Sequence, residues 1–192
     1  QKRRYFMYSL KDMMLGAELD MKYGTWLRSL VFEYIYTKYQ SGPYNHDHTQ
    51  NIGDHIAGLD DYYNHSIYTG WQHWGQVIGN PLYRSPIYNN DGTIEVRNNR
   101  FYAVHLGVEG SPTERLDYRV LTTYQKGWGT YGNPFTKAYK DFSFLVEAKY
   151  KFNHNWTVKG GYAMDFGSEK MYGHNAGFQL TVTKSGLLTK KK

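Results

Sequence analysis

Residues 144–152 read FLVEAKYKF, a stretch in which apolar and charged side chains alternate. A period of two sends successive side chains to opposite faces of a β-strand. Here the even positions are all apolar, and Glu147, Lys149 and Lys151 occupy odd ones. The stretch therefore predicts a strand whose two faces meet unlike surroundings.

The same alternation recurs along the chain and predicts further strands at 15–23, 30–37, 102–109, 116–125, 156–165 and 175–183. Together with 144–152 these make seven strands. A stretch from Tyr5 to Leu10 would be an eighth, and the sequence leaves that open. Between the first two strands, Gly24-Thr25 predicts a hairpin with a two-residue turn.

The composition agrees with a strand-rich fold and removes several classes of protein. Twenty Tyr and 20 Gly in 192 residues favour strands over helices. A mean hydropathy of −0.72 without a long apolar run excludes a helical membrane protein. A hydrophobic content of 40% excludes disorder. The absence of Cys excludes disulfides, thiolate metal sites and cysteine nucleophiles. The net charge of +6 is not gathered into a basic stripe, so no nucleic acid is expected as a partner.

The connections between the predicted strands alternate in length. Short ones are predicted at 24–25, 110–115 and 153–155, long ones at about 39–97 and 127–141, and one of intermediate length at 167–173. This alternation is typical of outer-membrane barrels, which combine short periplasmic turns with long external loops.

Aromatic side chains lie at the ends of the predicted strands on their apolar faces. An aromatic girdle at a bilayer interface requires this arrangement. The aromatic residues are Tyr23, Trp26, Tyr36, Tyr102, Tyr124, Phe152 and Trp156. The cationic side chains on these faces, Arg28, Lys38 and Lys126, are predicted near strand ends, where they would reach the headgroups. On the opposite face, Arg119, Lys149, Lys151 and Lys159 lie among carboxylates such as Asp117 and Glu147, which predicts interior ion pairs.

We therefore predict an all-β fold, an antiparallel up-and-down transmembrane β-barrel. Residues 1–192 would be the C-terminal part of a single barrel domain, with about 7–8 strands of a larger barrel and a long external loop at about 39–97. Seven strands alone would leave an unpaired edge in lipid, which is why a larger barrel is expected. A complete eight-strand barrel and a soluble β-sandwich remain open, since a sandwich also alternates.

The long loop carries a pool of polar side chains without a recognisable catalytic or metal-binding pattern. Five of the eight His residues lie between His46 and His73, near Asp47, Asp54, Asp60 and Asp61. Their spacing matches no standard site, so no metal and no cofactor are expected. Adjacent carboxyls such as Asp60 and Asp61 rarely flank one glycosidic bond. No nucleophile elbow, phosphate loop or dinucleotide fingerprint is present, and the protein is not expected to be an enzyme.

Four aromatic residues are predicted to lie in external connections: Trp71, Trp74, Trp128 and Tyr131. Aromatic faces pair with the C–H faces of sugar rings, while Asn, Asp and His bond the hydroxyls. The alternative is that these rings pack the long loop against the barrel mouth. The sequence leaves both possibilities open.

Several motifs resemble those of the capsule assembly Wzi family of Gram-negative outer-membrane proteins. They are Tyr62-Tyr63-Asn64-His65 leading to Gly70-Trp71, Gly75 to Ile78-Gly79-Asn80-Pro81-Leu82, Asn99-Arg100 before His105 to Gly110, Trp128-Gly129-Thr130-Tyr131, and Asp165-Phe166-Gly167. The similarity runs from about Tyr5 to Leu188 and covers the C-terminal part of the family pattern. In place of the terminal aromatic common in such barrels, this chain ends in lysines.

The resemblance implies a monomeric barrel of roughly eighteen strands in the cell outer membrane. It would bind capsular polysaccharide in a lectin-like, non-catalytic manner, with outer-membrane lipid as its other partner and no cofactor. The binding residues implied at external positions are Asn64, Trp71, Trp74, Asn80, Trp128 and Tyr131. Two alternatives are an outer-membrane porin or transport channel, and a soluble carbohydrate-binding β-sandwich.

Overall fold

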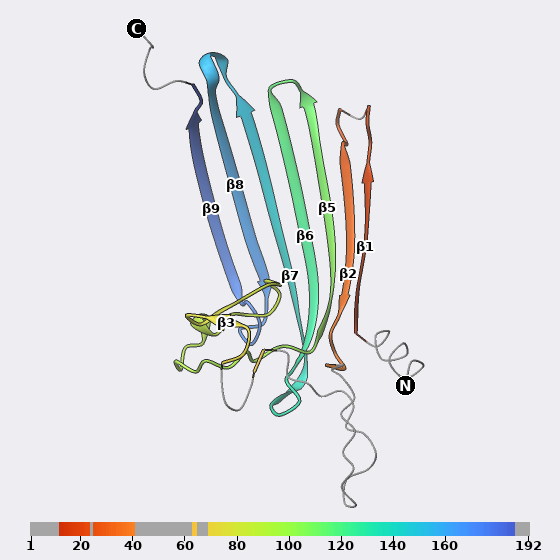
Figure 1. The fold of residues 1–192 in the computed structure, drawn as a ribbon, viewed down its shortest axis with the longest axis vertical. Coiled ribbons are helices and arrows are strands. Elements are labelled where there is room, and N and C mark those ends of the chain that lie inside the picture. Colours follow the sequence, from red (N-terminus) through yellow and green to blue (C-terminus); the bar gives the residue numbers. More distant parts are fainter. Residues whose placement is uncertain (1–11, 24, 41–62, 65–68, 187–192) are drawn as a thin grey trace, which may run out of the picture.

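The computed structural model describes residues 12–23, 25–40, 63–64 and 69–186, and in them the chain is an antiparallel β-sheet of seven strands (Figure 1). The strands are β1 (Met13–Asp20), β2 (Ser29–Tyr36), β5 (Phe101–Thr113), β6 (Leu116–Gly129), β7 (Pro134–Lys151), β8 (Trp156–Gly167) and β9 (His174–Lys184). Each strand pairs with its neighbour in this chain order. No helix in these residues is both long and apolar enough to cross a membrane.

The seven predicted strands are confirmed, with their bounds extended in several places. The structure adds a small hairpin of β3 (Gln72–His73) and β4 (Gln76–Val77), and two 3-10 turns, η1 (Pro86–Tyr88) and η2 (Asn153–Asn155). The stretch proposed as an eighth strand, Tyr5 to Leu10, lies outside the described residues.

The register places most apolar side chains of the seven strands on one face, which we call the apolar face, and most charged side chains on the other, which we call the polar face. One row of direct cross-strand neighbours is apolar from edge to edge: Leu19, Leu30, Val108, Val120, Val146, Tyr162 and Phe178. Pairing set by alternation is strongly specified, because a slip of one residue would turn every side chain to the other face. The predicted separation of faces is thus confirmed.

The connections define two ends of the sheet. Those between β2 and β5, β6 and β7, and β8 and β9 lie at one end, here called the loop end, and the others lie at the turn end (Figure 1). The strands leave only residues 130–133 between β6 and β7, so the long connection predicted at 127–141 is wrong. Residues 134–140 instead continue β7 beyond the end of β8, where they pair with β6 across a register shift after Gly127.

The predicted two-residue turn at Gly24-Thr25 is also wrong in length. Strand β1 ends at Asp20 and β2 begins at Ser29. The Met21 amide donates to the Arg28 carbonyl oxygen at 2.7 Å, which continues the pairing one step beyond the strands.

The hydrophobic core lies on the polar face, at the loop end. Residues 63–64 and 69–100, which we call the covering segment, contribute Leu82, Tyr83 and Val96 to it. The sheet contributes Ile35, Phe101 and Ala103, and the Tyr83 ring packs edge-on against Phe101 with centroids 4.9 Å apart. Since Ile35 and Ala103 are cross-strand partners on the polar face, the covering segment folds over that face.

Hydrogen bonds from buried side chains hold the covering segment in place. Gln125 of β6 donates from Nε2 to the Leu82 carbonyl oxygen at 3.1 Å. Asn98 accepts from the Gly129 amide through Oδ1 at 3.1 Å. The Thr37 hydroxyl donates to the Asn99 carbonyl oxygen at 2.8 Å. Buried polar groups with partners avoid the cost of desolvation, so these bonds fix one position for the segment.

Candidate functional site

A groove opens at the loop end between the covering segment and the strand extension of β7. Its volume is about 460 Å³, and its walls come from residues 84–97, 133–139 and 169–170. We call it the loop-end groove. Concave sites that combine apolar walls with a few polar groups are where small ligands bind.

One wall of the loop-end groove is aromatic. Phe135 and Tyr139 stand on the extension of β7, with their ring centroids 5.2 Å apart and their planes nearly perpendicular. Their odd sequence numbers place both residues on the polar face. Both lie beyond Asp141, where the pairing of β7 with β8 ends. Tyr88 of η1, which is 63% exposed, adds a third ring. Tyr88 is exposed and the other two rings are half-buried, and ring faces that line a groove are suited to the apolar faces of sugars.

The opposite wall is polar and is tied to the connection between β8 and β9. Arg84 donates from Nη1 to the Glu169 carbonyl oxygen at 3.2 Å and from Nη2 to the Tyr88 carbonyl oxygen at 2.8 Å. The Tyr172 hydroxyl donates to the Pro81 carbonyl oxygen at 2.9 Å. Burial raises the pKa of Tyr172, so this hydroxyl keeps its proton and remains a donor.

An ion pair closes the turn beside the groove. Arg97 donates from Nη2 to the Asp91 carboxylate and, at 3.0 Å, to the Thr93 hydroxyl. The Arg97 guanidinium, together with bonds from Thr93, lowers the pKa of Asp91 to about 2. The pair is exposed, so its role is to shape the turn rather than to stabilise the whole fold.

Two of the six predicted binding residues form hydrogen bonds with backbone groups of the covering segment. Asn64 forms two hydrogen bonds with the backbone of Val96. Its Nδ2 donates to the carbonyl oxygen at 2.9 Å, and its Oδ1 accepts from the amide at 2.8 Å. Asn80 accepts from the Leu82 amide through Oδ1 at 2.9 Å. These amides shape the covering segment.

Trp71 and Trp74 belong to the β3–β4 hairpin and are exposed. Trp74 is 86% exposed and has a φ of 51°, which places its backbone in the left-handed region. The Ile87 amide donates to the Gly75 carbonyl oxygen at 2.9 Å, so the hairpin is attached to η1. The two indoles are therefore available on the same covering segment as Tyr88.

The predicted placement of Trp128 in an external connection is wrong, because this residue lies in β6. Its ring is on the apolar face, 6.0 Å from the Tyr102 ring centroid, with Lys38 Nζ 4.5 Å and Lys126 Nζ 5.5 Å from its own centroid. Tyr131 does lie in a connection, but Arg100 covers its ring at 3.9 Å. The six predicted residues are consequently not brought together in one site.

Most of the predicted pool of His and Asp residues lies outside the described residues, and His73 is its only described member. Within 12–23, 25–40, 63–64 and 69–186, no group of three or more His, Asp or Glu side chains is arranged to hold a metal ion.

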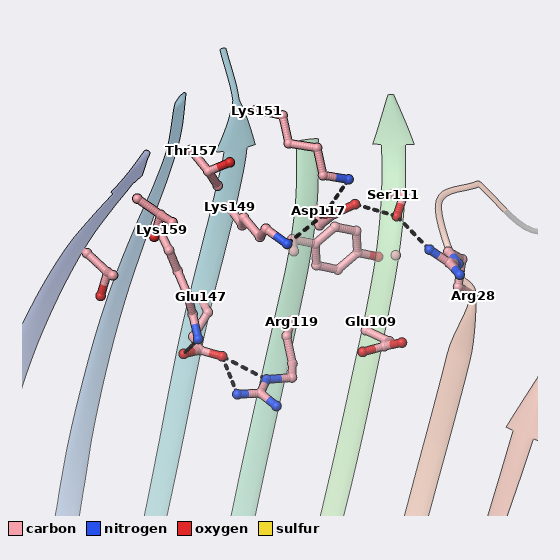
Figure 2. Close-up of a pocket in the computed structure, with 14 residues that line it drawn as sticks. Arg28, Glu109, Ser111, Asp117, Arg119, Glu147, Lys149, Lys151, Thr157 and Lys159 are labelled. Atoms are coloured by element: carbon pink, nitrogen blue, oxygen red, sulfur yellow. Dashed lines mark hydrogen bonds and ion pairs between the residues drawn. The ribbon is translucent and has the colours of Figure 1, made fainter. Parts of the chain in front are cut away.

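A second hollow, of about 500 Å³, lies on the polar face at the turn end (Figure 2). Glu147 accepts from Arg119 and lies 2.6 Å from Lys159 Nζ, while Asp117 lies 3.0 Å from Lys151 Nζ and 3.9 Å from Lys149 Nζ. The predicted ion pairs on this face are thus confirmed.

Arg28 also belongs to the polar side of the turn end. It donates from Nη1 to the Ser111 hydroxyl at 3.2 Å and lines this hollow (Figure 2). The prediction that Arg28 lies on the apolar face is therefore wrong.

The aromatic wall of the groove was missed because residues 134–140 were predicted to be loop. Phe135 and Tyr139 share the odd parity of Ser143, Glu147 and Lys149, and this is the signal that could have extended the strand.

Comparison of the chain with protein-family models, with curated proteins and with solved structures gives no match.

Proposed function

We propose that this chain is part of the wall of an outer-membrane β-barrel that takes part in capsule assembly and binds capsular polysaccharide at the cell surface without catalysis. The observation that carries the proposal is the position of the core. A soluble sandwich would bury its apolar face, whereas here the covering segment and the buried residues lie on the polar face. In the described residues the apolar face has no second sheet against it.

The dimensions of the apolar face support a lipid-facing role. Phe142 of β7 lies towards the loop end of the apolar face, where its cross-strand partner is Phe166. Phe152 follows β7 at the turn end, and its ring contacts Tyr150. At ~3.3 Å per residue Phe142 and Phe152 are about 33 Å apart along the strand. A barrel tilt of ~40° would reduce this to about 25 Å, the height of the apolar band in outer-membrane barrels.

The loop-end groove supports the binding of a saccharide. Tyr88, Phe135 and Tyr139 offer ring faces, and the side-chain amides of Asn90 and Asn133 lie in the same lining, with donors and acceptors for hydroxyls. The resemblance to the capsule assembly Wzi family supports capsular polysaccharide as the ligand. In such a barrel the loop end would face the outside of the cell.

Two measurements test the proposal. The chain, or the full-length barrel that contains it, should fold into lipid vesicles and become protected from protease along its strands. A stable, monomeric, detergent-free form would contradict the membrane assignment. Liposome swelling would separate the lectin from a channel, because solute flux would favour the latter.

The second measurement is retention of capsular polysaccharide by the folded protein. Tyr88→Ala and Tyr139→Ala should each weaken binding about tenfold, since each removes a ring from the groove. Tyr23→Ala is the control, because Tyr23 is an exposed ring in the connection at the turn end, outside the groove. Equal losses in all three variants, or no loss in any, would contradict the groove as the binding site.

A further inference from the structure

The apolar face is not uniformly neutral, and its charges have one sign. Within the seven strands it carries no carboxylate, and its lysines are Lys126, Lys140 and Lys184. Lys184 lies at the turn end, over the Trp156 ring. The other two lie at the loop end, where Lys38 joins them just after β2. The loop end of this face is therefore its more basic end.

Lys38, Lys126 and Lys140 form a cluster that we call the basic rim. Lys126 and Lys140 are direct cross-strand partners, and the ammonium groups of Lys38 and Lys126 share the Trp128 ring. Like charges directly opposite each other on one sheet face are unfavourable. Among the described residues the structure pairs none of the three with a carboxylate, in contrast to the lysines of the turn-end hollow.

The surroundings of the basic rim are those of a headgroup layer. Tyr36, Tyr102, Lys126 and Lys140 are consecutive neighbours across four strands, so rings and ammonium groups stand side by side at one level. Aromatic rings and long cationic side chains prefer the boundary between hydrocarbon and water. A lysine there contacts phosphate groups, because it is a compact donor with a full positive charge.

We propose that the basic rim binds the phosphate groups of an anionic lipid in the leaflet at the loop end of the strands. The proposal rests on the membrane assignment above and adds a partner of stated chemistry. Two ammonium groups over one indole, with the Lys140 side chain on the neighbouring strand, match a headgroup with more than one phosphate, whereas a zwitterionic headgroup would bring a repelling cation.

The test uses the folded chain in neutral detergent micelles and a fluorescent diphosphoryl lipid A as the probe, with energy transfer from tryptophan as the readout. The double variant Lys126→Gln with Lys140→Gln should bind about tenfold more weakly, because it removes two charge-assisted contacts. Lys126→Arg with Lys140→Arg should retain binding. Lys149→Gln with Lys151→Gln is the matched control, since it removes the same charge from β7 on the polar face.

Equal binding by the rim variant and the wild type would overturn the proposal, as would equal binding of a dephosphorylated probe. Competition by inorganic phosphate at the concentration of the lipid probe would assign the rim to a soluble anion instead. Insertion into phosphatidylcholine vesicles is measured separately. A chain that inserts there without preferring the phosphorylated lipid contradicts the rim alone, whereas a chain that fails to insert contradicts the membrane assignment.

Discussion

The same residue type is buried on one face of the sheet and exposed on the other. Phe101 lies on the polar face at the loop end and is 0% exposed beneath the covering segment. Phe178 lies on the apolar face and is 72% exposed. In a protein dissolved in water this arrangement would be inverted, because burial follows the larger apolar surface. The difference is the one expected if the apolar face meets lipid, as proposed above.

The largest expected effect comes from emptying the core on the polar face. Phe101→Ala removes a fully buried ring that packs against Tyr83, and it should destabilise the fold by about 3–5 kcal/mol. Phe178→Ala is its counterpart on the other face and should cost much less, since it leaves no enclosed cavity. Denaturant titration of both variants in micelles checks this. Similar losses would mean that Phe178 is buried in the folded protein.

A pair of adjacent residues gives a sharper comparison of the two faces. Val146 and Leu145 follow each other in β7, and they point to the apolar and the polar face respectively. In a bilayer Val146→Arg should cost about 2–4 kcal/mol, as a cation does at mid-membrane on the lipid side of a barrel. Leu145→Arg should cost less, because its side chain would face a wet interior.

The measurement is the free energy of folding into phosphatidylcholine vesicles, compared between Val146→Arg and Leu145→Arg. The same pair measured in the absence of lipid should lose its asymmetry if the apolar face requires hydrocarbon. A greater cost for Leu145→Arg in the bilayer would reverse the assignment of faces.

The strands and their faces were predictable because alternation is a local property, visible in stretches such as 144–152. The covering segment was not, since Leu82, Tyr83 and Val96 have no shared period and meet only through contacts distant in sequence. For the same reason the sequence could not tell that Asn64 bonds the backbone of Val96. The site residues depend on such contacts, and Trp71 and Trp74 are the most exposed of the six that were predicted.

A smaller effect is expected where the covering segment meets the sheet. A methyl group on Gly127 would stand 2.4 Å from Asn98 Oδ1, and Asn98 is buried. Gly127→Ala should therefore destabilise by about 1–3 kcal/mol, as overpacking does. Gly160→Ala is the control on the apolar face, where the added methyl meets nothing within 4 Å. Thermal unfolding of both variants checks the difference, and equal midpoints would show that Asn98 moves freely.

The smallest effect concerns the exposed turn closed by Asp91 and Arg97. The Thr93 amide donates to Asp91 Oδ1 at 3.2 Å, so its chemical shift reports the carboxylate. The pKa of Asp91 is lowered from 3.8 to about 2, and the turn is therefore stabilised above pH 3.8 and loses that contribution as the pH falls towards 2. In Arg97→Gln the midpoint for Thr93 should move up towards 3.8, while the core and the strands stay unchanged. An unmoved midpoint would mean that the Thr93 bonds alone hold the carboxylate, and that the arginine is free to meet a ligand in the loop-end groove.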